Sequence, residues 1–294
     1  MRYDRAAGSR CSMQITTVYG VYFSATGTTE KVVRCAADAA ADVLKAARQD
    51  ICFNLPRDRE RMLSFEAGDL VIFGVPVYAG RVPNLLLPYI KERIFGGGAA
   101  SVPVVLFGNR NFDDALIELR DLLEECGFHT VAAGAFVGEH AFSRILGEGR
   151  PDGTDLALSE QLGRRAADLL LNAVSKPSIC SADSGIAPVS VPGNQPPGPY
   201  YTPRDRYGNA IDILKVRPKT DESKCGGCGL CAELCPLGSV DPQNPAQITG
   251  ICMKCGACVK KCPSQAKYFD DPGYLYHKKE LEEMYERRAE SRIF

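Results

Sequence analysis

The chain has 294 residues, of which 45% are hydrophobic, and a formal net charge of −1 at pH 7. This length exceeds what one small domain needs, and the hydrophobic content is that of an ordinary globular protein. A net charge close to zero gives no reason to expect nucleic acid or an anionic membrane surface as a partner. No apolar run reaches the roughly 18 residues of a membrane span, so no such span is expected.

Residues 1–13 carry three arginines but no apolar stretch. A secretory signal needs such a stretch behind its charged start. We therefore expect no signal peptide here, and we predict a disordered N-terminal arm over residues 1–13.

From residue 14 to 174, strand-like and helix-like segments alternate along the chain. The predicted strands are 15–23, 70–75, 102–107 and 131–137 with a weaker one at 50–54, and the predicted helices are 29–47, 83–95, 112–126 and 154–174. Alternating strands and helices favour a parallel sheet that is covered by helices on both faces. The sequence therefore predicts an α/β domain with a doubly wound, five-stranded parallel sheet.

A loop rich in hydroxyl groups joins the first predicted strand to the first helix. Hydroxyls and helix N-terminal amides together can bind an anion. The loop lacks the lysine of a nucleoside triphosphate site, and no Gly-x-Gly-x-x-Gly motif of a dinucleotide site is present. It fits the phosphate monoester of FMN, although a helix cap that binds nothing stays open. Its residues are Ser24, Ala25, Thr26, Gly27, Thr28 and Thr29.

In this loop and in the order of its elements, the segment 14–174 resembles flavodoxins. The resemblance implies a flavodoxin-like fold with FMN, whose ring lies against the loops 76–83 and 108–114. By resemblance, Tyr78 stacks on or edges the ring, although an ordinary surface tyrosine is the alternative. The backbone of Ala79 and Gly80 would face ring atom N5, and Gly108 and Asn109 would offer backbone and amide groups to the pyrimidine edge. The candidate ring-binding residues are Pro76, Tyr78, Ala79, Gly80, Gly108, Asn109 and Arg110.

Two arginines and one histidine add chemistry to these loops. Arg81 and Arg110 depart from the apolar or acidic flavin surroundings of ordinary flavodoxins. A guanidinium there would stabilise an anionic reduced flavin, bind an anionic substrate or hold a docked domain, or either side chain could simply be solvated. His140 follows the fifth strand at the same edge and is the candidate catalytic proton donor, with a hydrogen-bonded loop histidine as the alternative.

Residues 175–220 change character, because eight prolines fall within them. Such a segment cannot form a helix and predicts an extended linker that wraps the surface. The cysteine-rich segment 221–270 follows it. The last segment, 271–294, predicts a charged C-terminal helix that acts as a solvated cap.

The pattern Cys-x2-Cys-x2-Cys-x3-Cys-Pro occurs twice in the cysteine-rich segment, and the copies are 27 residues apart. This repeat is typical of a bacterial-type ferredoxin with two [4Fe–4S] clusters, in which each fourth cysteine ligates the other cluster. A zinc ribbon is the alternative, but a zinc site needs only two Cys-x2-Cys pairs and does not require the third cysteine at the same spacing in each motif. The sequence predicts a small α+β domain in which Cys225, Cys228, Cys231 and Cys262 hold cluster A and Cys252, Cys255, Cys258 and Cys235 hold cluster B.

The whole chain resembles the flavodoxin–ferredoxin fusion proteins of anaerobic bacteria and archaea. Iron–sulfur clusters move one electron at a time, whereas FMN holds one or two. The combination of clusters and FMN predicts an electron-transfer protein that serves a redox partner protein such as a ferredoxin or an oxidoreductase. An FMN-dependent reductase of a small molecule is the alternative, so whether the chain is an enzyme stays open, as does a homodimer. A redox sensor is a third hypothesis without a supporting motif. Oxygen-sensitive clusters and many thiols predict a reducing cytoplasm.

Overall fold

The computed structural model describes residues 14–174 and 187–294. The predicted arm over residues 1–13 and the linker residues 175–186 lie outside the described residues. Among the helices of the described ranges, none has both the length and the apolar character to cross a membrane.

A five-stranded parallel sheet lies at the centre of the α/β unit, which we define as residues 14–174. In spatial order its strands are β2 (Ala47–Cys52), β1 (Thr17–Tyr22), β4 (Asp69–Pro76), β6 (Ala100–Phe107) and β8 (Gly134–Val137). Numbered along the chain, the order of these five strands is 2-1-3-4-5, which is the flavodoxin-like doubly wound order. The predicted fold class is therefore confirmed. In this order a ligand crevice lies beyond the carboxyl ends of β1 and β4, where the winding reverses.

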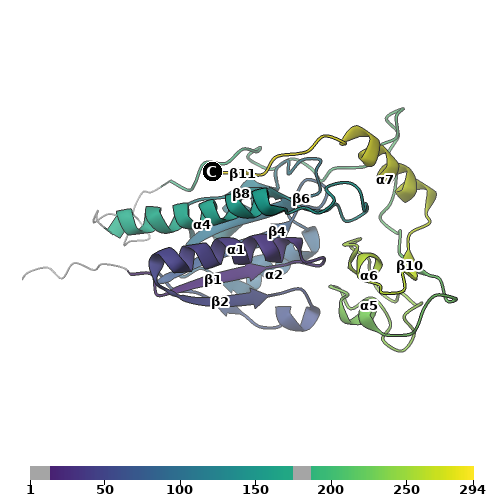
Figure 1. The fold of residues 1–294 in the computed structure, drawn as a ribbon, viewed down its shortest axis with the longest axis horizontal. Helices are drawn as coiled ribbons and strands as arrows, with labels where there is room; N and C mark the ends of the chain where they lie inside the picture. The colour runs from purple at the N-terminus through teal and green to yellow at the C-terminus, as the bar shows by residue number, and fades with distance from the viewer. Residues whose placement is uncertain (1–13, 175–186) are drawn as a thin grey trace, which may run out of the picture.

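Helices cover both faces of this sheet, as Figure 1 shows. α1 (Thr28–Leu44) and α4 (Gly153–Val174) lie on one face, and α2 (Leu87–Arg93) and α3 (Ala115–Glu125) pack into the core on the other. The alanine-rich face of α1 lets α4 come close, because a Cβ atom at Gly163 would overlap with the Ala36 carbonyl. Two 3₁₀ helices, η1 (Pro56–Arg59) and η2 (Asn84–Leu86), complete the α/β unit.

Six short strands extend or flank the parallel sheet. β7 (His129–Thr130) pairs with β6, and β3 (Leu63–Ser64) pairs with β5 (Ile94–Phe95). β9 (Lys219–Thr220) and β10 (Lys267–Tyr268) form an antiparallel pair beside the cysteine motifs. β11 (Arg292–Ile293) adds an antiparallel edge strand to β8. The chain thus returns at its end to the sheet with which it began.

The described part of the predicted linker, from residue 187, lies along the α/β unit. The Val189 amide donates to the Thr130 carbonyl, and the Asp114 carboxylate accepts hydrogen bonds from the amides of Asn194 and Gly198 at 2.9 and 2.8 Å. At the carboxyl edge of the sheet, the Tyr201 amide donates to the Ala79 carbonyl at 2.8 Å. These contacts carry the chain along the α3 side to the edge where the flavin loops lie.

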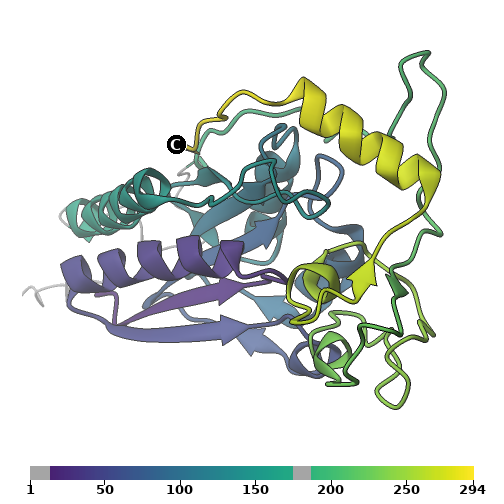
Figure 2. The ribbon, with the colours of Figure 1, turned by 45° about the vertical axis from the view of Figure 1, so that its right-hand side comes forward.

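The cysteine unit, defined as residues 221–270, contains α5 (Leu230–Glu233) and α6 (Ala257–Lys260). It lies beyond the carboxyl ends of the parallel strands, as both Figure 1 and Figure 2 show. The left-handed glycines Gly229 (φ 74°) and Gly256 (φ 76°) precede its two short helices. A residue with a Cβ atom is strained in this conformation, which accounts for glycine at both positions.

The C-terminal helix differs from the solvated cap expected from its charges. α7 (Pro272–Met284) begins earlier than the charged run, where Asp271 caps it by accepting from the Tyr274 amide at 2.9 Å. Tyr274, His277 and Leu281 are buried on one face, at the spacing of an amphipathic helix. Residues 285–294, which we call the C-terminal strap, then run back to the sheet and end in β11 (Figure 2).

Candidate functional site

The predicted phosphate loop lies at the carboxyl end of β1 and leads into α1. Gly27, with φ 98°, is the N-cap residue of α1 and has no side chain to cap the helix. The first-turn amides of Thr28 and Thr29 are therefore left for an anion, as a phosphate site requires, whereas that of Glu30 is taken by Ser24. The Ser24 hydroxyl accepts from the Glu30 amide at 3.0 Å, and the Ser24 amide donates to Asn54 Oδ1 at 2.5 Å. Asn54 fixes the loop from the end of β2, a role that no motif in the sequence indicated.

The second flavin loop forms a tight turn around Ala79 and Gly80. Their φ values are 51° and 77°, and Tyr78 and Arg81 exchange backbone hydrogen bonds of 3.0 and 3.1 Å across the turn. Positive φ at both central residues defines a hairpin turn of the primed type. A Cβ atom at Gly80 would overlap with the Asp113 carboxylate, so glycine is required there.

Tyr78 lies between this turn and the second cysteine motif. Its half-buried ring packs against the core cluster that contains Cys255. Burial raises the pKa of the Tyr78 hydroxyl well above its ordinary value, and the nearby Cys255 and Cys252 add to that rise. Tyr78 is therefore an interface residue between the two units rather than the ordinary surface tyrosine that was the alternative.

Gly108 and Asn109 lie at the carboxyl end of β6, but the Asn109 side chain faces a different partner from the one expected. Its Nδ2 donates to the carbonyls of Tyr285 and Arg287 at 2.8 and 2.7 Å, and its Oδ1 accepts from the Ala289 amide at 3.1 Å. The expectation that this amide faces the flavin is corrected here, because every hydrogen bond of the group goes to the C-terminal strap. Gly108 contacts His140, since a Cβ atom at Gly108 would lie 2.8 Å from the His140 Cα.

Arg81 holds the linker on the α/β unit. It makes a bidentate pair with the buried Glu118, with two distances of 2.7 Å, donates to the Gly198 carbonyl and lies over the Tyr200 ring at 4.9 Å. Glu118 also accepts from the Val82 amide at 2.8 Å. Arg81 is thus neither a solvated loop residue nor free to bind an anionic ligand.

Arg110 is also engaged, on the other flavin loop. It pairs with Asp113, and its guanidinium lies over the Tyr201 ring at 4.6 Å. Of the roles left open for the two arginines, the geometry favours that of holding other parts of the chain.

His140 lies above Gly108 and is surrounded by protein on most sides. Its Nδ1 accepts from the Phe142 amide at 3.1 Å, which leaves the proton on Nε2. Burial lowers the pKa of His140 to about 3, with smaller contributions from Lys260, His277 and Arg110. The ring is neutral near pH 7 and can donate a hydrogen bond from Nε2, and its role as a catalytic proton donor stays a prediction.

The cysteines of cluster A line one cavity. Cys225, Cys228, Cys231 and Cys262 surround it together with Gly226, Leu230 and Lys267. The fourth cysteine thus comes from the second motif, as the crossed pattern requires. A backbone amide, that of Ala266, donates to the Cys262 sulfur at 3.3 Å. Such amide–sulfur contacts tune the potential of a cluster.

The cysteines of cluster B also lie together across the two motifs. Burial raises the pKa values of Cys252, Cys255 and Cys258, and the nearby Cys235 contributes to all three rises. The amides of Ser239 and Lys254 donate to the sulfurs of Cys235 and Cys252 at 3.3 and 3.4 Å.

The cysteine arrangement can be compared with what one metal ion and one cluster need. Within residues 14–174 and 187–294, no group of three or more His, Cys, Asp or Glu side chains is arranged to hold one metal ion. A four-iron cube keeps its four thiolates apart by its own width, whereas zinc draws four ligands to one point. A cavity bordered by four cysteines fits the cube.

The cluster B motif is packed against the α/β unit. Cys255 and Ala257 are buried in the same hydrophobic cluster as the core beneath α2 and α3. A Cβ atom at Gly256 would lie 2.5 Å from the Ala141 carbonyl oxygen, so the two backbones touch. Cys228 of cluster A, by contrast, is exposed. The two cysteine sets therefore differ in position, one against the flavin loops and one facing outward.

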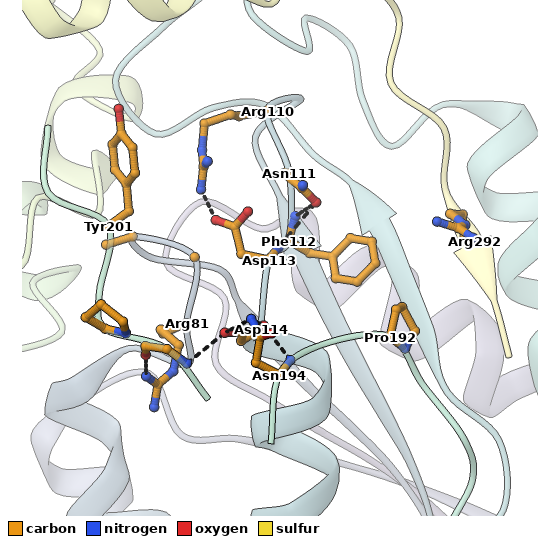
Figure 3. A pocket seen from close by; sticks show the side chains of 14 residues that line it. Arg81, Arg110, Asn111, Phe112, Asp113, Asp114, Pro192, Asn194, Tyr201 and Arg292 are labelled. Carbon is orange, nitrogen blue, oxygen red and sulfur yellow. Dashed lines mark hydrogen bonds and ion pairs between the residues drawn. The ribbon is translucent and has the colours of Figure 1, made fainter. Parts of the chain in front are cut away.

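Figure 3 shows a cleft of about 580 Å³ between the flavin loops, the linker and β11. Ala79 and Gly80 line it, but no residue of the phosphate loop and no cysteine does. The other lining residues are Arg81, Arg110, Asn111, Phe112, Asp113, Asp114, Pro192, Asn194, Gly198, Pro199, Tyr201 and Arg292.

Residues 218–241 match a family described as a 4Fe-4S binding domain. No curated protein matches the chain. Similar solved structures include a flavodoxin from the domain Archaea, with 14% identity, a TM-score of 0.35 and coverage of 53% of this chain and 99% of that one. A mutant flavodoxin of Fusobacterium nucleatum bound to flavin mononucleotide has 17% identity, a TM-score of 0.32 and coverage of 55% and 96%. Rubredoxin oxygen:oxidoreductase of the anaerobe Desulfovibrio gigas has 18% identity, a TM-score of 0.38 and coverage of 55% and 38%.

The strand order alone identifies the fold of residues 14–174, independently of these solved structures. The family match falls on the first cysteine motif. The chain thus combines an α/β unit of flavodoxin-like strand order with a segment, residues 218–241, that matches a 4Fe-4S binding domain.

Proposed function

We propose that this protein is an iron–sulfur flavoprotein that passes electrons between two [4Fe–4S] clusters and FMN. Cluster A is held by Cys225, Cys228, Cys231 and Cys262, and cluster B by Cys252, Cys255, Cys258 and Cys235. Electrons move between an outside partner and cluster A, then between the clusters, and then between cluster B and the flavin.

The observation that carries this proposal is the packing of the cluster B loop on the carboxyl edge of the sheet. Cys255 is only 8% exposed, and Tyr78 of a flavin loop packs against its core cluster. In a doubly wound fold, this edge is where the ligand lies. This packing supports a cluster beside the flavin crevice within a single chain, in which case the internal transfer needs no second copy of the protein.

The residues of the crevice fit FMN. A helix whose N-cap residue is glycine follows a hydroxyl-rich loop without lysine, and its amides at Thr28 and Thr29 suit a phosphate monoester. We assign the phosphate to residues 24–29 and the ring to the loops that carry Tyr78, Gly80 and Gly108. Bound there, FMN supplies the capacity to hold one or two electrons and to exchange protons, which the clusters lack. His140 Nε2–H is available as a neutral hydrogen-bond donor at this edge.

The outward face of cluster A, around the exposed Cys228, is the docking site for the redox partner, a ferredoxin or an oxidoreductase. Clusters of this kind and numerous free thiols require a reducing compartment, so we assign the protein to the cytoplasm and to anaerobic metabolism.

One observation favours a second function, that of an FMN-dependent reductase fed by its own clusters. The cleft of about 580 Å³ reaches Ala79 and Gly80 and is wide enough for a small molecule. A substrate in this cleft would lie beside the turn that we assign to the flavin ring.

The two functions are tested by anaerobic reductive titration, followed by visible and EPR spectra, of protein whose iron and flavin content is known. The relay requires about eight irons and one FMN per chain, and flavin reduction in one-electron steps. Reduction in a single two-electron step, together with reoxidation by a small molecule, would favour the reductase. Protein that retains iron but binds no FMN would refute both.

A further inference from the structure

An ion pair joins the cysteine unit to the α/β unit beside the proposed flavin crevice. Lys260 Nζ lies 2.8 Å from Glu139 Oε2, and the two side chains are 9% and 35% exposed. Lys260 is the last residue of α6, and Glu139 is the second residue after β8. Lys261, the next residue along the chain, is exposed. Of two adjacent lysines, therefore, one is buried in the interface and the other is not.

The charge of Lys260 lowers the pKa of His140, and His140 contacts Gly108. After burial, Lys260 is the first of the charged groups that lower the pKa of His140. The other two charged groups near His140 are Arg110 and His277. Arg110 is paired with Asp113, and the pKa of His277 is itself lowered by burial and by Arg110, so each contributes less positive charge than Lys260. Glu139 opposes Lys260 and is itself near Arg144. Lys260 thus contributes positive charge at the ring.

A field that disfavours a proton on an imidazole favours negative charge on another group in the same place. Gly108, which His140 contacts, belongs to the loop that we assign to the pyrimidine edge of the flavin. A reduced flavin is a weak acid whose anion carries its charge on that part of the ring, and protein charges near it tune the potential.

We propose that the Lys260–Glu139 pair sets the reduction potential of the flavin, with Lys260 favouring the reduced, anionic form and Glu139 opposing it. This inference rests on the proposed function, because it requires FMN in the crevice. The pair transfers no electron or proton itself. Through Lys260, the docked cysteine unit supplies one charge of the flavin site, so docking alters the flavin as well as bringing a cluster near it.

The test compares Lys260→Met and Glu139→Gln with the matched control Lys261→Met. The midpoint potential of FMN is measured by anaerobic spectroelectrochemistry, and the cluster potentials are measured by EPR. We expect Lys260→Met to reduce the ratio of reduced to oxidised flavin at a given potential about tenfold, which is 59 mV for one electron. Glu139→Gln should shift the ratio the other way, and Lys261→Met should leave it unchanged.

A pair that only clamps the two units together gives a different result. Both interface variants would then weaken docking alike, and their flavin potentials would shift in the same direction or not at all, which would overturn the inference. Both lysines lie between Cys258 and Cys262, so an effect through the clusters would appear equally in Lys261→Met. If Lys260→Met loses iron, Glu139→Gln still decides, because Glu139 belongs to the α/β unit. Failure of the wild-type protein to bind FMN would refute the proposed function itself, whereas bound FMN with unchanged potentials would overturn only this inference.

Discussion

Replacing Asn109 should release the C-terminal strap from the α/β unit. The Asn109 carboxamide is 4% exposed and makes three hydrogen bonds, to the backbones of Tyr285, Arg287 and Ala289. At about 1 kcal/mol for each hydrogen bond, Asn109→Ala should lower the free energy of strap release by about 3 kcal/mol. Alanine adds a backbone cost of about 1 kcal/mol, because φ is 65° at this position and asparagine tolerates the left-handed region better.

The reporter for this prediction is the Phe294 amide, which donates to the Ala133 carbonyl at 2.8 Å and lies away from Asn109 in the sequence. Its hydrogen exchange measures how often β11 leaves the sheet. A loss of about 3 kcal/mol raises the open fraction about a hundredfold, and the total of about 4 kcal/mol for Asn109→Ala raises it several hundredfold, since each 1.4 kcal/mol is a factor of ten. Asn109→Gly is the matched control, because it loses the same hydrogen bonds but fits the left-handed backbone. It should raise exchange less than Asn109→Ala does.

Faster exchange of the Ala289 amide alone, with the Phe294 amide unchanged, would refute this reasoning. That result would mean that Asn109 makes a local contact and that other groups anchor the strap. The strongest alternative anchor is Asp155, which is paired with the buried Arg150 and accepts from the Ser291 hydroxyl at 2.6 Å.

Three further predictions concern the cofactors and the pH dependence. Cys235→Ser should remove the EPR signal of the cluster headed by Cys252 and spare the other, whereas loss of the cluster headed by Cys225 would contradict the crossed assignment. Thr26→Val should reduce the FMN content of purified protein several-fold without changing iron content, and an unchanged flavin content would place the phosphate elsewhere. Stability should fall as the pH is lowered below 6.5, because the pKa of His140 is lowered to about 3 and the unfolded chain takes up the proton first. Denaturation between about pH 7 and 5.5 should show a slope to which His140 contributes at most about 1.4 kcal/mol per pH unit, beside a share from His277, whose pKa burial also lowers, and an equal slope in His140→Gln would exclude His140 as a source.

Features with a strong local pattern could be predicted from the sequence. Four apolar, β-branched segments separated by helical ones, with the weaker polar strand β2 at the edge, give the parallel sheet, and the cysteine repeat gives the crossed sets through a known ligation pattern. The loop around Gly27 could be identified because it needs only a strand, hydroxyls and a helix in succession.

Contacts between distant segments could not be predicted. β11 is two residues long and pairs with β8 from the far end of the chain, so it has no periodicity of its own. Arg81 looked like a flavin-loop charge, because nothing local shows that Glu118 and Gly198 surround it. Of the three buried residues of α7, Tyr274 and His277 precede the charged run and only Leu281 lies within it, so the charges outweighed the spacing in the prediction.

These distant contacts explain how a small interface can keep the cluster B motif docked. The cysteine unit is tied to the α/β unit on both sides, by the linker through Arg81 and Asp114 and by the strap through Asn109. Two tethers make docking an intramolecular event with a high effective concentration, so each contact between the units can be weak. Under the function that we propose, the two tethers would hold the cluster B cysteines beside the flavin loops.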